Sequence, residues 1–349
     1  MAIGAGSAPP LAVAGGATAW LARLPAGLFA MPVGIVGLAG AWRRAAAFGW
    51  PVAAAVGDAL AAFAVILFAL LLVLYAAKAL RHPRAIAGEF QHPVAGALMA
   101  LLPLSLLLFV VHYGAPRAPG WLALTLVALV LQGIVAMRVV RTLATGELPQ
   151  TAVTPALYLP PVTGGFVGGM ALATLGYPGW AALLFGMGLA SWGLLEVRVL
   201  NRLFEGPMPE QLRPTIGIEI APPSVATLAA GVIWPTLSGE VLIVGLGIAA
   251  GPVVAVIARY PWWSRAPFGI GFWSFSFPVA ALAGAVIEVD RRGGWPPVVA
   301  GIAIAIASLA IAWLAVRTLS LLVRRRLLPP APAAPTMAAG HQPSTGNPQ

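Results

Sequence analysis

Cysteine is absent from this sequence, lysine occurs once, and charged residues make up only 9% of the 349 positions. Without cysteine, disulfide bonds, thiolate metal sites and cysteine nucleophiles are excluded. The four histidines are scattered and lack the spacing of metal ligands, so we expect no metal site and no cofactor. A soluble domain carries about 25% charged residues. This chain falls far short of that share, so lipid must cover most of its surface.

Long apolar runs take the place of charge, since 60% of the residues are hydrophobic and the mean hydropathy is +0.92. A helix needs roughly 20 apolar residues to cross about 30 Å of hydrocarbon. Segments of this kind run approximately over 24–43, 52–77, 93–113, 121–143, 153–176, 179–201, 214–236, 240–260, 268–289 and 297–322. We therefore predict an all-α polytopic membrane protein with ten transmembrane helices arranged as five helical hairpins.

Three regions follow from these segments. Residues 1–23 form an N-terminal cytoplasmic segment, and 24–322 form the transmembrane domain. The remaining residues, 323–349, are rich in proline, alanine and polar residues, so we expect a disordered cytoplasmic tail.

Basic residues predict the orientation of the spans, because cytoplasmic loops are enriched in arginine and lysine. Fifteen of the 20 basic residues fall on the side that would hold both termini and the loops after even-numbered spans. The other side holds Arg43, Arg44, Arg117, Arg291 and Arg292. We therefore expect an inner (plasma) membrane protein with both termini in the cytoplasm. Since the basic residues lie at the ends of apolar runs, we attribute the net charge of +10 to topology and expect no nucleic-acid partner.

Proline falls inside every odd-numbered span, at Pro32, Pro103, Pro160, Pro222 and Pro278, but in only one even-numbered span. At 1.5 Å per residue these prolines lie roughly 10–15 Å from the cytoplasmic end. Proline removes a backbone hydrogen bond and bends the helix, and freed carbonyls in a membrane must face protein or water. We predict an inner ring of five kinked odd helices around a pore, inside an outer ring of five even helices. The alternative is that proline is simply common in membrane helices.

Four stretches of the sequence carry a family resemblance. They read PALYLPPVTGGF at 155–166, LRPTIGIEIAPPSV at 212–225, GFWSFSFPVAALA at 271–283 and, more weakly, LPAGLFAMPVGIVGLAGAW at 24–42. The chain resembles the tellurite-resistance TehA family, which includes plant slow-type anion channels, malate transporters and sulfite efflux proteins. The resemblance implies a ten-helix channel with five inner and five outer helices, commonly assembled as a homotrimer.

The same resemblance implies a gate. The lumen in this family is narrow and is closed by a phenylalanine on the ninth helix, which matches Phe277 here, directly before Pro278. Phe277 lies nine residues after Phe268, roughly 14 Å into the membrane. An aromatic ring at that depth can form a hydrophobic constriction that gates by dewetting. From the residues alone, packing against a neighbouring helix is the alternative.

Anion selectivity requires no buried cation on this interpretation. The odd spans have no arginine or lysine near mid-depth, where a fixed positive site would hold an anion too tightly for conduction. We expect a positive cytoplasmic mouth to enrich small inorganic or organic anions. Hydroxyl groups either donate hydrogen bonds to the anion or bond within their own helix. The candidate pore-lining hydroxyls are Ser105, Thr163, Ser224, Thr227 and Ser276.

Glu219, about two turns into the seventh span, is an intramembrane acid and therefore a candidate functional residue. Three interpretations are open. Desolvation keeps it protonated, an interfacial arginine pairs with it, or it faces away from the lumen. A proton-linked role would make the protein a coupled carrier.

Two alternative functions are compatible with this predicted fold. The first is a gated transmembrane channel for small anions, and the second is a secondary transporter of C4-dicarboxylate, sulfite or tellurite. No HExxH sequence, P-loop or pair of carboxylates at one depth is present, so we predict no catalytic residues.

Overall fold

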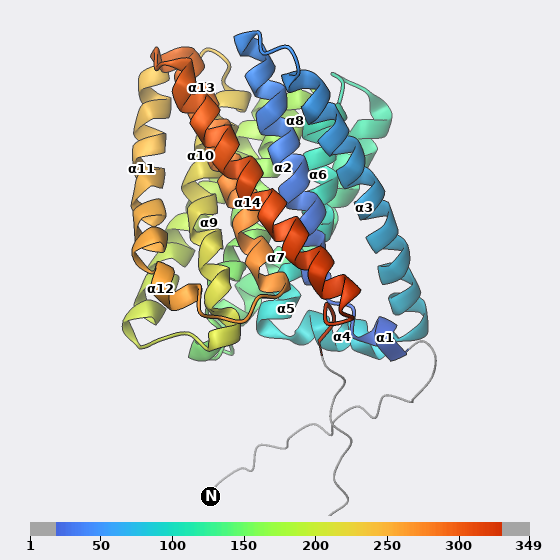
Figure 1. Cartoon of the computed structure of the whole chain (residues 1–349). Coiled ribbons are helices and arrows are strands. Elements are labelled where there is room, and N and C mark those ends of the chain that lie inside the picture. The colour runs from blue at the N-terminus through green and yellow to red at the C-terminus, as the bar shows by residue number, and fades with distance from the viewer. Residues whose placement is uncertain (1–18, 330–349) are drawn as a thin grey trace, which may run out of the picture.

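The computed structural model describes residues 19–329 (Figure 1). Ten helical segments in this range are long and apolar enough to cross a membrane, which confirms the predicted number. The bounds differ from the predicted ones by up to five residues, as in the first span, which ends at Phe48. The predicted disordered tail lies outside the described residues from 330 onward, as does most of the predicted N-terminal segment.

The odd-numbered spans are called the inner spans below, and each is built of two or three helical pieces. They are η1 (Ala26–Phe29) with α2 (Ala30–Ala45) and η2 (Ala46–Phe48); α5 (Pro93–Leu98) with α6 (Leu101–Tyr113); η4 (Pro155–Tyr158), η5 (Leu159–Thr163) and α8 (Gly164–Thr174); η6 (Glu210–Ile220) with α10 (Ala221–Ile233); and η7 (Ile270–Phe275) with α13 (Ser276–Gly293).

The even-numbered spans, called the outer spans, are single α-helices. They are α3 (Ala53–Arg81), α7 (Pro119–Ala144), α9 (Pro178–Phe204), α11 (Gly239–Ala258) and α14 (Pro297–Val323). Short helices α1 (Ala19–Ala22), α4 (Pro83–Gln91) and α12 (Tyr260–Trp263) lie at one end of the bundle, with the C-terminal end of α14 (Figure 1). We call this end the terminal side and the opposite end the far side.

Burial separates the two sets of helices. In the most apolar stretch of each inner span 67 to 89% of residues are buried, against 17 to 28% in the outer spans. The inner spans also form a closed cycle of neighbours, because α2 packs on α6, α6 on α8, α8 on α10, α10 on α13, and α13 on α2. Each outer helix packs against the inner helix that precedes it. The exposed residues of the outer helices are mostly large and apolar, as a lipid-facing surface requires.

The prolines of the inner spans lie where the type of helix changes. The α-helices α2, α6, α10 and α13 begin one or two residues before Pro32, Pro103, Pro222 and Pro278, respectively. Proline fits the first turn of a helix, where its missing N–H is not needed. The residues before it form tighter 3-10 turns or, before Pro103, a short separate helix. The terminal-side half of each inner span is therefore less regular than the far-side half.

The fifth span departs from this pattern, because Pro160 and Pro161 lie within a π-helical turn, η5. An outer helix supplies the missing hydrogen bonds there. Gln132 of α7 donates from Nε2 to the carbonyl oxygens of Leu159 at 2.9 Å and Pro160 at 3.0 Å. A buried carbonyl without a donor is costly in hydrocarbon. Gln132 thus stabilises the irregular turn.

Candidate functional site

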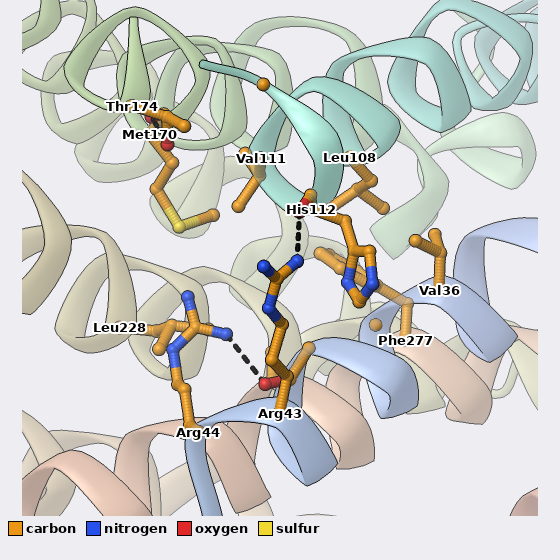
Figure 2. A pocket seen from close by; sticks show the side chains of 14 residues that line it. Val36, Arg43, Arg44, Leu108, Val111, His112, Met170, Thr174, Leu228 and Phe277 are labelled. Atoms are coloured by element: carbon orange, nitrogen blue, oxygen red, sulfur yellow. Dashed lines mark hydrogen bonds between the residues drawn. The ribbon is translucent and has the colours of Figure 1, made fainter. Parts of the chain in front are cut away.

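A cavity of about 360 Å³ lies on the far side, within the cycle of inner helices (Figure 2). All five inner spans contribute to its wall. The polar residues among them are Arg43, Arg44, His112 and Thr174, and apolar side chains such as Val111 and Met170 make up much of the rest. We call it the far-side cavity.

A second, smaller cavity of about 80 Å³ lies on the terminal side, and again all five inner spans line it. Its wall is almost wholly apolar and includes Leu98, Leu101, Leu159, Ile218 and Ile270. The bends at the prolines therefore surround this cavity, which we call the terminal-side cavity.

Phe277 is the one residue in the described range 19–329 that lines both cavities. Its side chain is only 6% exposed, and it occupies the first turn of α13 next to Pro278. The ring packs on α2 at Gly37, where an added Cβ would lie 3.0 Å from the ring. One turn earlier, a Cβ on Gly34 would overlap the hydroxyl group of Ser276. The two glycines thus let α2 approach α13 closely at the level of the ring.

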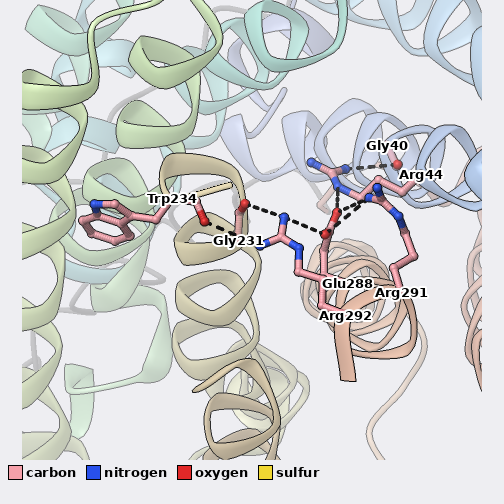
Figure 3. A network of polar contacts seen from close by, with 7 residues as sticks. All are labelled: Gly40, Arg44, Gly231, Trp234, Glu288, Arg291 and Arg292. Carbon is pink, nitrogen blue, oxygen red and sulfur yellow. Dashed lines mark hydrogen bonds and ion pairs between the residues drawn. The ribbon is translucent and has the colours of Figure 1, made fainter. Parts of the chain in front are cut away.

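Charged side chains gather at the far side around one carboxylate (Figure 3). Glu288, on α13, forms ion pairs with Arg44 at 3.5 Å, Arg291 at 3.4 Å and Arg292 at 3.1 Å. Arg44 also donates to the carbonyl oxygen of Gly40 at 3.0 Å. These contacts tie α13 to α2 above Phe277.

Further contacts on the far side involve other helices. Arg292 donates to the carbonyl oxygen of Gly231 on α10 at 2.9 Å. Arg43 donates to the carbonyl oxygen of His112 on α6, and the imidazole of His112 contacts Asp58 of α3 at 3.4 Å. Four helices around the far-side cavity are thus joined through arginine.

The candidate pore-lining hydroxyls had two interpretations, lining the pore or bonding within their own helix. All five side chains are buried, and none of them lines either cavity. Ser105, Thr227 and Ser276 donate to carbonyl oxygens of their own spans at 2.7 to 2.8 Å. The hydroxyl groups of Thr163 and Ser224 have no hydrogen-bond partner within the described part of the chain.

Glu219 is placed next to a cation. Its Oε2 lies 3.6 Å from Arg259 at the end of α11, and its side chain is 10% exposed. Glu219 lines neither cavity. The ion pair fits the second of the three interpretations that the sequence left open, and the absence of Glu219 from both cavity walls fits the third.

Known proteins resemble this chain over most of its length. A family model described as "SLAC1: Voltage-dependent anion channel" matches residues 23–321. The chain belongs to this family. A tellurite resistance protein TehA homolog from Haemophilus influenzae is 29% identical over 271 residues, which cover 74% of this chain and 79% of the relative. The resemblance that the sequence motifs carry is thereby confirmed.

Plant members of the SLAC1 family match shorter stretches. The guard cell S-type anion channel SLAC1 of Arabidopsis thaliana is 28% identical over 142 residues, 39% of this chain and 24% of the plant protein. The S-type anion channel SLAH2 of the same plant is 25% identical over 131 residues, which cover 36% and 24% of the two chains. This family places the protein among anion channels and transporters of membranes.

Sequence reasoning missed the polar wall of the far-side cavity. It treated Arg43 and Arg44 only as markers of topology and left His112 without a role, whereas all three line the cavity. A signal was present, because Arg43 and Arg44 lie at the end of a predicted inner span. The inner spans were expected to surround the pore, so residues at their ends lie near its mouth. Within residues 19–329 no group of three or more His, Asp or Glu side chains is placed to hold a metal ion.

Proposed function

We propose that this protein is a gated channel through which small anions cross the membrane passively, with Phe277 as the gate. One observation carries the proposal: Phe277 is common to two cavities that all five inner spans surround. Removal of the ring would join the cavities into one path. A bulky apolar side chain at such a point excludes water and hence ions.

The absence of acids from the described cavity walls favours a channel over a proton-coupled carrier. Neither wall includes an aspartate or glutamate within residues 19–329. Glu219, the intramembrane acid considered for proton coupling, pairs with Arg259 and lines neither cavity, and the titratable side chain that does line the far-side cavity, His112, contacts Asp58. A wall with arginines and no carboxylates favours anions over cations.

The test is an anion-flux assay in liposomes that compares the wild type with Phe277→Ala. We expect chloride flux to rise about tenfold or more, equivalent to a barrier lowered by about 1.4 kcal/mol. Phe109→Ala is the matched control, because Phe109 is as buried, lies on inner helix α6, packs on Phe68 and lines neither cavity. Its flux should equal that of the wild type.

Two results would contradict the proposal. Unchanged flux in folded Phe277→Ala protein would remove the ring as the gate. Flux that saturates and depends on an opposing proton gradient, in a way that Glu219→Gln abolishes, would favour the carrier for C4-dicarboxylate, sulfite or tellurite instead.

Orientation and assembly are part of the same proposal. With both termini in the cytoplasm, the far-side cavity opens to the outside of an inner membrane, as the distribution of basic residues supports.

The homotrimer that the family resemblance implies would bury part of the apolar outer helices. Its mass in detergent, measured by light scattering, tests this.

A further inference from the structure

We infer that the far-side cavity holds a binding site for a small oxyanion such as nitrate, with the guanidinium group of Arg43 as its principal ligand. The inference rests on the proposed function, because the site lies on the same path above Phe277. It assigns a specific residue of this chain to the anion on that path.

Most N–H donors of the Arg43 guanidinium group make no hydrogen bond within residues 19–329. Its side chain is exposed within the far-side cavity, where it donates one hydrogen bond to the carbonyl oxygen of His112. No carboxylate in residues 19–329 lies within ion-pair distance of it. A guanidinium group has five N–H donors, so most of its donors remain for a ligand. The bond to His112 fixes the direction in which they point.

Arg44 contributes charge beside this site but is held more firmly. Its charge is already balanced by Glu288 at 3.5 Å, and one of its N–H groups donates to the carbonyl oxygen of Gly40. Figure 2 shows both guanidinium groups extending from α2 into the cavity, with Val111 and Met170 on the other side of it. Of the two arginines in the cavity wall, Arg43 is therefore the one that has no carboxylate partner among residues 19–329, and Arg44 shares its charge with Glu288.

The surrounding charges leave a positive excess. Glu288 is shared by Arg44, Arg291 and Arg292, so one carboxylate faces three guanidinium groups (Figure 3). Arg43 adds a fourth guanidinium group, and the carboxylate of Asp58 contacts His112 at 3.4 Å without lying within ion-pair distance of Arg43. Apolar walls of low dielectric constant focus such a field on the cavity and raise the local anion concentration.

The geometry of the donors selects the class of anion. A guanidinium group presents two parallel N–H bonds that match two oxygens of one oxyanion, whereas a spherical halide takes no advantage of this fork. A cavity of about 360 Å³ admits a small anion that keeps part of its hydration shell. Because the cavity is open and Arg43 is exposed, binding is weak enough to permit release.

The experiment measures binding without requiring an open path. The melting temperature of the purified full-length protein is followed against nitrate, with gluconate replacing it to keep ionic strength constant. We expect nitrate to stabilise the wild type, and Arg43→Gln to raise the apparent Kd for nitrate about tenfold or more. Arg291→Gln is the matched control, because it removes one guanidinium group from the far side in the same way but at a residue that does not line the cavity.

A second variant separates geometry from charge. Arg43→Lys keeps the charge but loses the fork, so it should weaken nitrate binding while the weaker response to chloride stays unchanged. Equal nitrate affinity in wild type, Arg43→Gln and Arg43→Lys would overturn the inference, as would a loss of the same size in Arg291→Gln. Nitrate binding that depends on Arg43, together with unchanged flux in Phe277→Ala, would support the site and overturn the proposed gate.

Discussion

On the terminal side of Phe277 the inner spans are 3-10, π or short α-helical pieces around a cavity of about 80 Å³, whereas on the far side they are regular α-helices around about 360 Å³. The polar groups differ in the same way. On the terminal side, Lys78 and Glu89 are buried and bonded to backbone or to each other, whereas on the far side Arg43, Arg44 and His112 line the cavity. The polar groups of the terminal side thus join helices, and those of the far side both join helices and line a cavity.

Lys78 shows how the terminal side is held. Its ammonium group, on α3, donates to Glu89 of α4 at 2.5 Å and to the carbonyl oxygen of Leu24 at 2.7 Å. Glu89 in turn accepts from the backbone N–H of Ala26 at 2.6 Å, where the first inner span begins. Both partners are buried, with side chains 3% and 10% exposed. The pair fixes the entrance of the span to two neighbouring helices.

Lys78→Met should have the largest effect on stability, because it leaves the carboxylate of Glu89 buried without its cation. We expect the free energy of unfolding in detergent to fall by about 3–5 kcal/mol. Lys78→Met combined with Glu89→Gln should recover much of this loss, since the amide oxygen still accepts from Ala26. A single variant as stable as the wild type would show that the terminal side does not depend on this pair.

Gln132→Leu should have an intermediate effect. The substitution removes both hydrogen bonds to the carbonyl oxygens of Leu159 and Pro160, and leaves them buried. We expect a loss of about 1–3 kcal/mol in the free energy of unfolding. Thr125→Val on the same helix is the control, because its hydroxyl bonds only within α7, to Trp121. Equal losses in the two variants would argue that α7 does not support the π-helical turn.

The comparison also shows what could be predicted from local residue types. The number of spans and the alternation of buried and exposed helices followed from hydropathy and from the prolines, since both depend on the residues of one segment at a time. The change of helix type at each proline was expected only as a kink. The π-helical turn of the fifth span accepts hydrogen bonds from Gln132 of another helix, and such a contact is not visible in a local pattern.

The faces of the inner helices were harder to predict. A helix that is apolar on all sides has no polar stripe to indicate which residues meet a lumen, and the inner spans are of this kind. The hydroxyl groups of Ser105 and Ser224 therefore had two interpretations, lining a pore or bonding within a helix; both side chains are buried, and Ser105 donates to a carbonyl oxygen of its own helix. Arg43 and Arg44 were counted for orientation alone, because a loop residue and a residue that folds back into a cavity look alike in sequence.

Arg291→Gln should have the smallest effect on the free energy of unfolding. It allows an exposed ion pair of the far side to be compared directly with the buried pair of Lys78 on the terminal side. Arg291 pairs with Glu288 at 3.4 Å, but its side chain is 39% exposed and two further arginines share the same carboxylate. In the variant, water replaces the contacts of Arg291, and Glu288 keeps its other two arginine partners. We therefore expect the free energy of unfolding to fall by less than about 1 kcal/mol. High salt should reduce this loss further while leaving that of Lys78→Met nearly unchanged, because salt screens exposed pairs and not buried ones. Unfolding of both variants at two salt concentrations measures this difference, and equal losses with equal salt dependence would mean that charge serves the same structural purpose on both sides of Phe277.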